Sequence, residues 1–171
     1  MKTKDLVNEL EDKEVYKNFK EKYPDSFFSA GFFILNLQDK SEQLQLDYFL
    51  PSESKIAAFE FPFSEPKIHD EIISVKNGQT VGKEISEQKS QSLDLEIDID
   101  DLENKSLEII KENSSSVNPT KIIAILKDDI WNLTCMDNML GIIRIKINAK
   151  TGETVNFNKG SLMDFMGIRK K

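Results

Sequence analysis

The sequence has few of the residues from which most active sites and metal sites are built. It contains one histidine, His69, and one cysteine, Cys135, among 171 residues. A single cysteine excludes an internal disulfide bond and a zinc site made of several thiolates. One histidine leaves little for a catalytic triad or a histidine-based metal site. We therefore expect no enzymatic activity, no cofactor and no metal, with His69 at the surface and Cys135 in the core.

Long apolar runs and basic clusters are also scarce. No stretch approaches the ~20 apolar residues of a membrane span, and residues 1–12 lack the continuous apolar run of a signal peptide. The net charge is -7, and the only tight basic cluster comprises residues 169–171. Because such a chain repels phosphate groups, nucleic acid is disfavoured as a partner. We expect a cytoplasmic protein that has no membrane span and binds no nucleic acid.

The composition that remains is that of a folded protein. Hydrophobic residues make up 39% of the chain and charged residues 31%, which is enough apolar material for a core. The hydrophobic periodicity predicts an α+β fold of two units, each a helix followed by an antiparallel three-stranded sheet. The units span residues 1–63 and 93–171. Between them, residues 64–92 form a polar linker with room for one short strand or hairpin, for which Asn77-Gly78 is a suitable turn.

The expected elements follow from the same periodicity. The first unit contains a helix over 4–22 and strands over 27–37, 44–50 and 56–63. The second contains a short strand over 93–97, a helix over 101–113, strands over 121–126, 131–135 and 143–147, and a short C-terminal helix over 161–166. The strands over 27–37 and 121–126 are apolar on both faces, so each needs cover on both sides or offers one face for binding.

The order of elements is similar in the two units, which suggests a pseudo-repeat. The stretch from Leu46 to Ile56 has the same length as that from Leu133 to Ile143. Two small units packed together would bury more apolar surface than either unit alone. The sequence leaves open whether the two units share one sheet or pack face to face.

An acidic run precedes the second expected helix and invites comparison with a calcium site. Its members are Asp94, Glu96, Asp98, Asp100, Asp101 and Glu103. A calcium-binding EF-hand loop that began at Asp94 would need glycine where Ile99 stands. We therefore expect a helix cap instead, with Asp100 as the N-cap residue and Glu103 completing a capping box.

The second unit resembles the PepSY-like superfamily over residues 100–157, and the pseudo-repeat extends this resemblance weakly to the first unit. The resemblance depends on a helix, a strand, a strand that contains Trp131, and a final strand that runs into a turn. That last stretch reads Ile143-Arg144-Ile145-Lys146-Ile147-Asn148-Ala149-Lys150-Thr151-Gly152-Glu153. In the family the turn is typically Asp-Ala-x-Thr-Gly-Glu, and here Asn148 stands in place of the aspartate. The resemblance implies a PepSY/cystatin-like fold without catalytic residues, in a family that is mostly secreted or membrane-linked and is associated with regulating peptidases.

Aromatic residues are concentrated in the first unit, where nine of the fifteen lie between Phe27 and Phe63. They predict either a phenylalanine-rich core or a sheet surface that binds an apolar partner. The C-terminal segment adds two apolar residues that could dock on the protein's own body or on a partner. The candidate partner-binding residues are Phe32, Phe33, Tyr48, Phe49, Phe59, Phe61, Leu162 and Phe165.

These observations favour a non-enzymatic protein-binding or regulatory module whose partner is another protein. One alternative is an acidic chaperone-like protein that holds an apolar client and forms a dimer. Another is a small-ligand carrier with a pocket between helix and sheet. The sequence leaves the oligomeric state open, including a homodimer.

Overall fold

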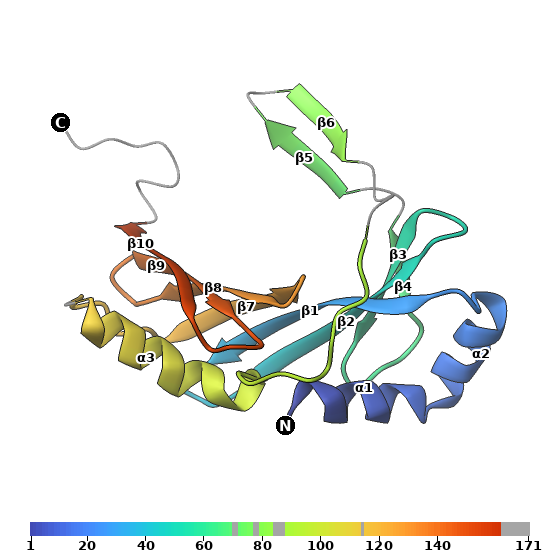
Figure 1. Cartoon of the computed structure of the whole chain (residues 1–171), viewed down its shortest axis with the longest axis horizontal. Coiled ribbons are helices and arrows are strands. Elements are labelled where there is room, and N and C mark those ends of the chain that lie inside the picture. The colour runs from blue at the N-terminus through green and yellow to red at the C-terminus, as the bar shows by residue number, and fades with distance from the viewer. Residues whose placement is uncertain (70–71, 77–78, 84–87, 114, 162–171) are drawn as a thin grey trace.

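The computed structural model describes residues 1–69, 72–76, 79–83, 88–113 and 115–161, with backbone alone for 72–76, 79–83 and 161. Its main body is one eight-stranded antiparallel sheet with strand order β10-β9-β8-β7-β1-β2-β3-β4 (Figure 1). The strands of this sheet are β1 Phe27–Asn36, β2 Glu42–Leu50, β3 Lys55–Glu60, β4 Lys67–His69, β7 Lys121–Lys127, β8 Ile130–Met136, β9 Gly141–Asn148 and β10 Thr154–Ser161. A separate two-stranded sheet consists of β5 Ile72–Lys76 and β6 Gln79–Lys83.

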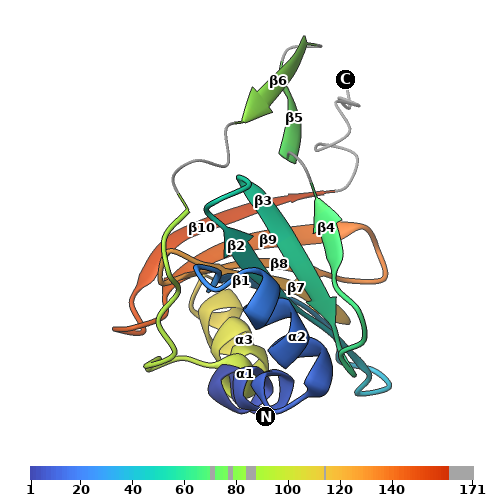
Figure 2. The ribbon, with the colours of Figure 1, turned by 90° about the vertical axis from the view of Figure 1, so that its right-hand side faces the viewer.

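The described helices cover one face of the sheet. They are α1 Thr3–Glu11, α2 Glu14–Lys22 and α3 Leu102–Glu112, and the 3₁₀ turn η1 Ile99–Asp101 leads into α3. Figure 2 shows these helices on one side of the sheet and the β5–β6 hairpin on the other. The helices bury an apolar stripe against alternating side chains of the strands, as amphipathic helices and half-buried strands do. The fully buried members include Leu6, Leu10, Leu102, Ile109, Leu46, Ile122 and Trp131.

The prediction of two helix-plus-three-strand units is wrong. The first and last parts of the chain share a single sheet, to which each contributes four strands, and the three helices of the described residues lie on one face. Strands β1 and β7 pair in antiparallel register from Ala30–Lys127 to Asn36–Lys121. The alternation of side chains reports the faces of a strand and carries no information about its edges. In two isolated sheets, the backbone N–H and C=O groups along these edges would lack hydrogen-bond partners within the protein. Pairing β1 with β7 provides partners for both edges at once.

Contacts across this central seam tie the two parts of the chain into one core. The rings of Phe33 on β1 and Trp131 on β8 lie 5.7 Å apart, centroid to centroid. The indole Nε1 of Trp131 donates a hydrogen bond to the carbonyl oxygen of Ile97 at 2.8 Å. The segment before α3 is therefore attached to the sheet through a core side chain.

The helical segment over 4–22 is two helices rather than one. The backbone leaves the helical region at Lys13, where φ is -81° and ψ is 147°. Asp12 ends α1, where its backbone N–H donates to the carbonyl oxygen of Asn8 and that of Lys13 donates to Leu10. The break turns α2 so that Tyr16 and Phe19 also face the core.

The region before α3 also differs from expectation. Residues 93–97 do not form a strand, although the backbone N–H groups of Glu96 and Ile97 both bond the carbonyl oxygen of Ala149. The cap lies at Asp98, two residues before the predicted Asp100, and Asp101 completes the capping box. A helix cap of the expected type is thus present, but Asp98 forms it. Asp98 also accepts hydrogen bonds from the backbone and hydroxyl of Thr3 in α1, in a buried position, which favours it over the exposed Asp100.

The predicted linker contributes to the structure at both of its ends. β4 joins the main sheet next to β3, and β5 and β6 form the hairpin whose proposed turn, Asn77-Gly78, lies outside the described residues. At the other end Gln91 is buried, and its backbone N–H donates to the carbonyl oxygen of Phe28. Its side-chain amide bonds both the backbone N–H and the carboxylate of Asp129, each at 2.9 Å.

Candidate functional site

The face of the sheet opposite the helices carries a central apolar stripe. We define the central stripe as Phe32 and Ile34 of β1 with Ile123 and Ile125 of β7. Phe32 lies directly opposite Ile125, and Ile34 lies opposite Ile123. All four are accessible in part, and Ile125 is 37% exposed. No helix among the described residues covers this side, which we call the helix-free face (Figure 2).

Polar side chains flank the central stripe in an ordered row. Reading across the paired strands from β3 to β9, the row is Glu60, Gln45, Phe32, Ile125, Asn132 and Lys146. Its centre is apolar, an amide follows on each side, and a charge of opposite sign stands at each end. We call this set the central row. Glu60 and Lys146 are both exposed, whereas Gln45 and Asn132 are half-buried.

Beside the central stripe the same face holds a small covered cluster. Phe49 and Ile56 are buried, and Phe27 packs against them, with the rings of Phe27 and Phe49 5.6 Å apart. Asp47 lies next to this cluster, and its carboxylate accepts a hydrogen bond from Gln45 Nε2 at 2.8 Å. Burial raises the pKa of the Asp47 carboxyl, while the Gln45 hydrogen bond and the charges of His69 and Lys127 act in the opposite direction.

The structure separates the predicted partner-binding residues into three groups. Phe33, Tyr48 and Phe59 lie under the helices and are fully buried, so they belong to the core. Phe49 is buried on the helix-free face. Phe32, in the central stripe, and Phe61, 41% exposed at the end of β3, are accessible. Leu162 and Phe165 lie outside the described residues.

The aromatic-rich first segment is explained mainly by core packing. Phe19 packs edge-on against Phe59 at 5.0 Å, and Tyr48 packs edge-on against Phe59 at 5.6 Å. Tyr16 adds a further ring, 5.5 Å from Tyr48. Such contacts stabilise a core beyond the burial of apolar area alone.

Three accessible residues of the central stripe were not among the predicted candidates: Ile34, Ile123 and Ile125. The sequence did contain evidence for them, because the strands over 27–37 and 121–126 are both apolar on both faces. What the sequence did not reveal is that these two strands are neighbours. Only their pairing gathers the four side chains into one surface.

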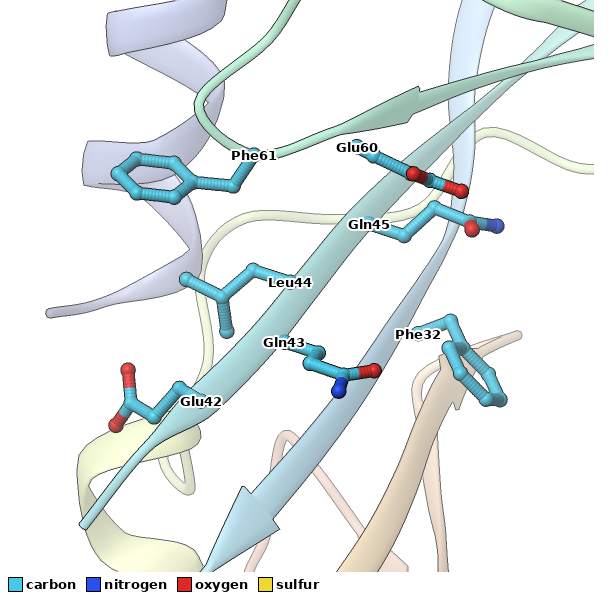
Figure 3. A pocket seen from close by; sticks show the side chains of 7 residues that line it. All are labelled: Phe32, Glu42, Gln43, Leu44, Gln45, Glu60 and Phe61. Carbon is cyan, nitrogen blue, oxygen red and sulfur yellow. The ribbon is translucent and has the colours of Figure 1, made fainter.

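A hollow of about 250 Å³ lies at one side of the central stripe (Figure 3). It forms where β3 ends at Glu60 while β2 extends to Glu42, and just beyond β3 the backbone N–H of Phe61 donates to the carbonyl oxygen of Leu44. Figure 3 shows Leu44 and Phe61 pointing to one side of the strands, and Phe32, Gln43 and Gln45 to the other. Its volume is below the roughly 300–1,000 Å³ of typical small-molecule sites.

The single histidine and the single cysteine of the chain lie in different surroundings. His69 is exposed and Cys135 is buried, as expected. Burial raises the pKa of the Cys135 thiol to about 11, against the opposing effect of its hydrogen bond with Ser106, so it is protonated at neutral pH. Within the described ranges no three His, Cys, Asp or Glu side chains lie close enough to hold a metal ion. None of the described helices is long and apolar enough to span a membrane.

Comparison with known proteins adds little to this picture. No protein-family model matches the sequence, and no curated protein matches it. Among solved structures, a similar chain is a "putative lipoprotein" from Clostridium difficile 630, with 12% sequence identity, coverage of 86% of this chain and 91% of that chain, and a TM-score of 0.47. A likeness of this degree supports no statement about the fold or function of this chain. The PepSY-like resemblance and the cytoplasmic location therefore stay predictions.

Proposed function

We propose that this protein is a non-enzymatic binding module that contacts another protein surface through its helix-free face. The observation that carries the proposal is the central stripe. Its four apolar side chains, on two adjacent strands, remain accessible, and polar side chains of the central row lie on either side of it. An apolar centre with a polar rim is the usual arrangement of a protein–protein contact surface.

The two alternatives receive less support. The described hollow is small for a drug-sized ligand, which disfavours a carrier. A chaperone for unfolded clients would need an extended apolar surface, whereas the central stripe consists of four side chains bounded by Gln45 and Asn132. An ordered surface of this size fits a defined partner better.

The test places a charge in the middle of the central stripe. Ile125→Glu should weaken binding strongly because it would bury a carboxylate against an apolar partner surface. Leu107→Glu on α3 is the matched control, since Leu107 is 38% exposed and Ile125 is 37% exposed, but Leu107 lies on the helical side of the molecule. Both variants should retain the thermal stability of the wild type to within a few degrees.

The measurement is cross-linking and quantitative capture from lysate of the cells that make the protein. We expect proteins captured by the wild type to be retained by Leu107→Glu and to fall about tenfold or more with Ile125→Glu. The proposal is wrong if Ile125→Glu captures the same proteins in the same amounts, or if the wild type neither captures a protein nor self-associates.

A further inference from the structure

We infer that the partner of the helix-free face is the same face of a second copy of this chain. The two copies are related by a two-fold axis that runs parallel to the strands, in the plane between the sheets and over the seam between β1 and β7. This inference rests on the proposed function and adds the identity of the partner and the geometry of the contact.

The first step of the argument is the self-complementarity of the central row. A two-fold axis along the seam exchanges β3 with β9, β2 with β8 and β1 with β7 in projection. It places Glu60 of one copy over Lys146 of the other, Gln45 over Asn132, and Phe32 over Ile125. Opposite charges, two amides and two apolar side chains thus meet in turn along the whole row.

Neighbouring rows fit the same axis. In the next row Ile34 of one copy lies over Ile123 of the other, and Gln43 lies over Thr134. In the row on the other side, the axis places Lys127 over Ala30 and Asp47 over Ile130, so Lys127 stands one strand spacing, ~4.8 Å, from the position of Asp47 in the second copy. The complementarity is therefore not confined to one row.

The charges also select this axis over the alternative. Two identical sheet faces can meet about an axis parallel to the strands or about one perpendicular to them. The perpendicular axis would place Glu60 near Glu60 and Lys146 near Lys146, because it leaves each strand over itself. Facing sheets lie ~10 Å apart, so the long glutamate and lysine side chains can reach across the rim of the contact.

The contact would protect the part of the sheet that is apolar on both faces. Phe33 and Leu35 of β1 are covered by helices, while Phe32 and Ile34 of the same strand have no helical cover among the described residues. A strand with two apolar faces is typical of a sheet covered on both sides. A second copy supplies that cover with an apolar surface of the same width.

The test uses charge reversal at the two ends of the central row, read by analytical ultracentrifugation over a range of protein concentrations. The wild type should form a concentration-dependent dimer. Glu60→Lys alone and Lys146→Glu alone should each raise the dimer dissociation constant about tenfold or more, because each creates two like-charge contacts across the axis. The double variant Glu60→Lys/Lys146→Glu should restore wild-type dimerisation.

Mixing the two single variants gives the sharpest readout. One chain then carries two lysines on the row and the other two glutamates, so the mixture should form a heterodimer although neither variant dimerises well alone. Lys67→Gln is the control, since Glu60 also pairs with Lys67 within its own chain at 3.1 Å. Loss of that pair by itself should leave the dimer unchanged.

Three results would overturn the inference: a wild type that is monomeric at every concentration, a dimer insensitive to both reversals, or no recovery in the double variant and the mixture. A monomeric wild type is also the outcome expected if the β5–β6 hairpin, on the same side of the sheet in Figure 2, folds onto this face. The proposed function fails separately. If Ile125-dependent capture of another protein persists while the chain is monomeric, the face binds a different partner.

Discussion

At the scale of single residues, Asp47 is a partly buried ionisable side chain on the helix-free face. It stands between the buried Phe49–Ile56 cluster and the central stripe, and its main polar contact is the amide of Gln45. Burial raises its pKa above the ordinary value of 3.8. The folded protein therefore holds a proton on Asp47 at pH values where the unfolded chain has released it.

This shift predicts a stability that depends on pH with a definite sign. Between the unfolded and folded pKa values of Asp47 the folded state binds more protons, so stability falls as pH rises through that interval. Asp47→Asn removes this loss of stability, because asparagine does not ionise, and it keeps a side-chain oxygen that can accept the hydrogen bond from Gln45. The variant should melt at a higher temperature than the wild type near pH ~7, and the difference should vanish in acid below both pKa values.

Thermal melts across pH provide the measurement, and Asp39→Asn is the opposite-sign control. Hydrogen bonds from the Ser41 hydroxyl and backbone N–H lower the pKa of the Asp39 carboxyl. The stabilisation from Asp39 is present at pH values above its pKa in the unfolded chain, and it is lost as pH falls through its pKa in the folded protein. A wild type and an Asp47→Asn variant that melt together at every pH would contradict the account.

At the scale of elements, Asp98 joins two parts of the chain that are distant in sequence. Its Oδ1 accepts hydrogen bonds from Thr3 N at 2.9 Å, Thr3 Oγ1 at 2.6 Å and Ile99 N at 2.7 Å. The same carboxylate therefore satisfies the first backbone N–H of α1 and the first of η1, both of which would otherwise lack a partner. This contact brings the N-terminal helix against the start of α3, 95 residues later in the sequence.

Loss of this carboxylate should be costly. Asp98→Ala leaves two backbone donors in a buried place without an acceptor, so we expect the free energy of unfolding to fall by about 2 kcal/mol. Asp98→Asn should cost less because its side-chain oxygen can still accept. Chemical denaturation measures both.

Asp94→Ala serves as the control, because Asp94 is exposed in the same acidic run. Its free energy of unfolding should stay within about 0.5 kcal/mol of the wild type. Equal effects at positions 94 and 98 would show that Asp98 acts through general charge rather than through its hydrogen bonds.

At the scale of the whole molecule, the seam between β1 and β7 makes one cooperative body of two chain segments that look separable in sequence. The hydrogen-bonded register of the two strands and the Phe33–Trp131 contact cross this seam. Neither segment could unfold without exposing an edge and a core face of the other. We therefore expect a single two-state transition.

The chain carries natural probes for this prediction. All three tyrosines, Tyr16, Tyr23 and Tyr48, lie in the first segment, and the one tryptophan, Trp131, lies in the last. Tyrosine absorbance and tryptophan fluorescence should therefore report the same denaturation midpoint. Two separated midpoints would indicate segments that fold independently and would contradict the continuous sheet as the cooperative unit.

Much of the local structure could be predicted from sequence, because it depends on periodicity. The strand over 44–50 was recognised from the alternation that buries Leu46 and Tyr48. The break at Lys13 was missed, since the apolar positions of α1 and α2 together resemble one loose stripe. β4 was missed because Lys67–His69 is short and exposed, and it is defined only by pairing with β3.

The candidate site was less predictable for the same physical reason. Phe33, Tyr48 and Phe59 are chemically as suitable for a partner as Phe32, and only the placement of the helices decides which of them stay accessible. The central stripe and the central row combine residues from six strands, which belong to two distant parts of the sequence. Their common surface exists only because the strands pair in one order and register.

By itself, the sequence determined the chemistry that this protein has little of and the faces of its strands, because composition and period-two alternation are local properties of a chain. It thereby predicted a buried thiol, an exposed histidine, and two strands with apolar side chains on both faces. The tertiary structure decided which edges meet, and so converted two expected sheets into one. That choice depends on backbone pairing between residues about 90 positions apart, which leaves no mark in the local pattern.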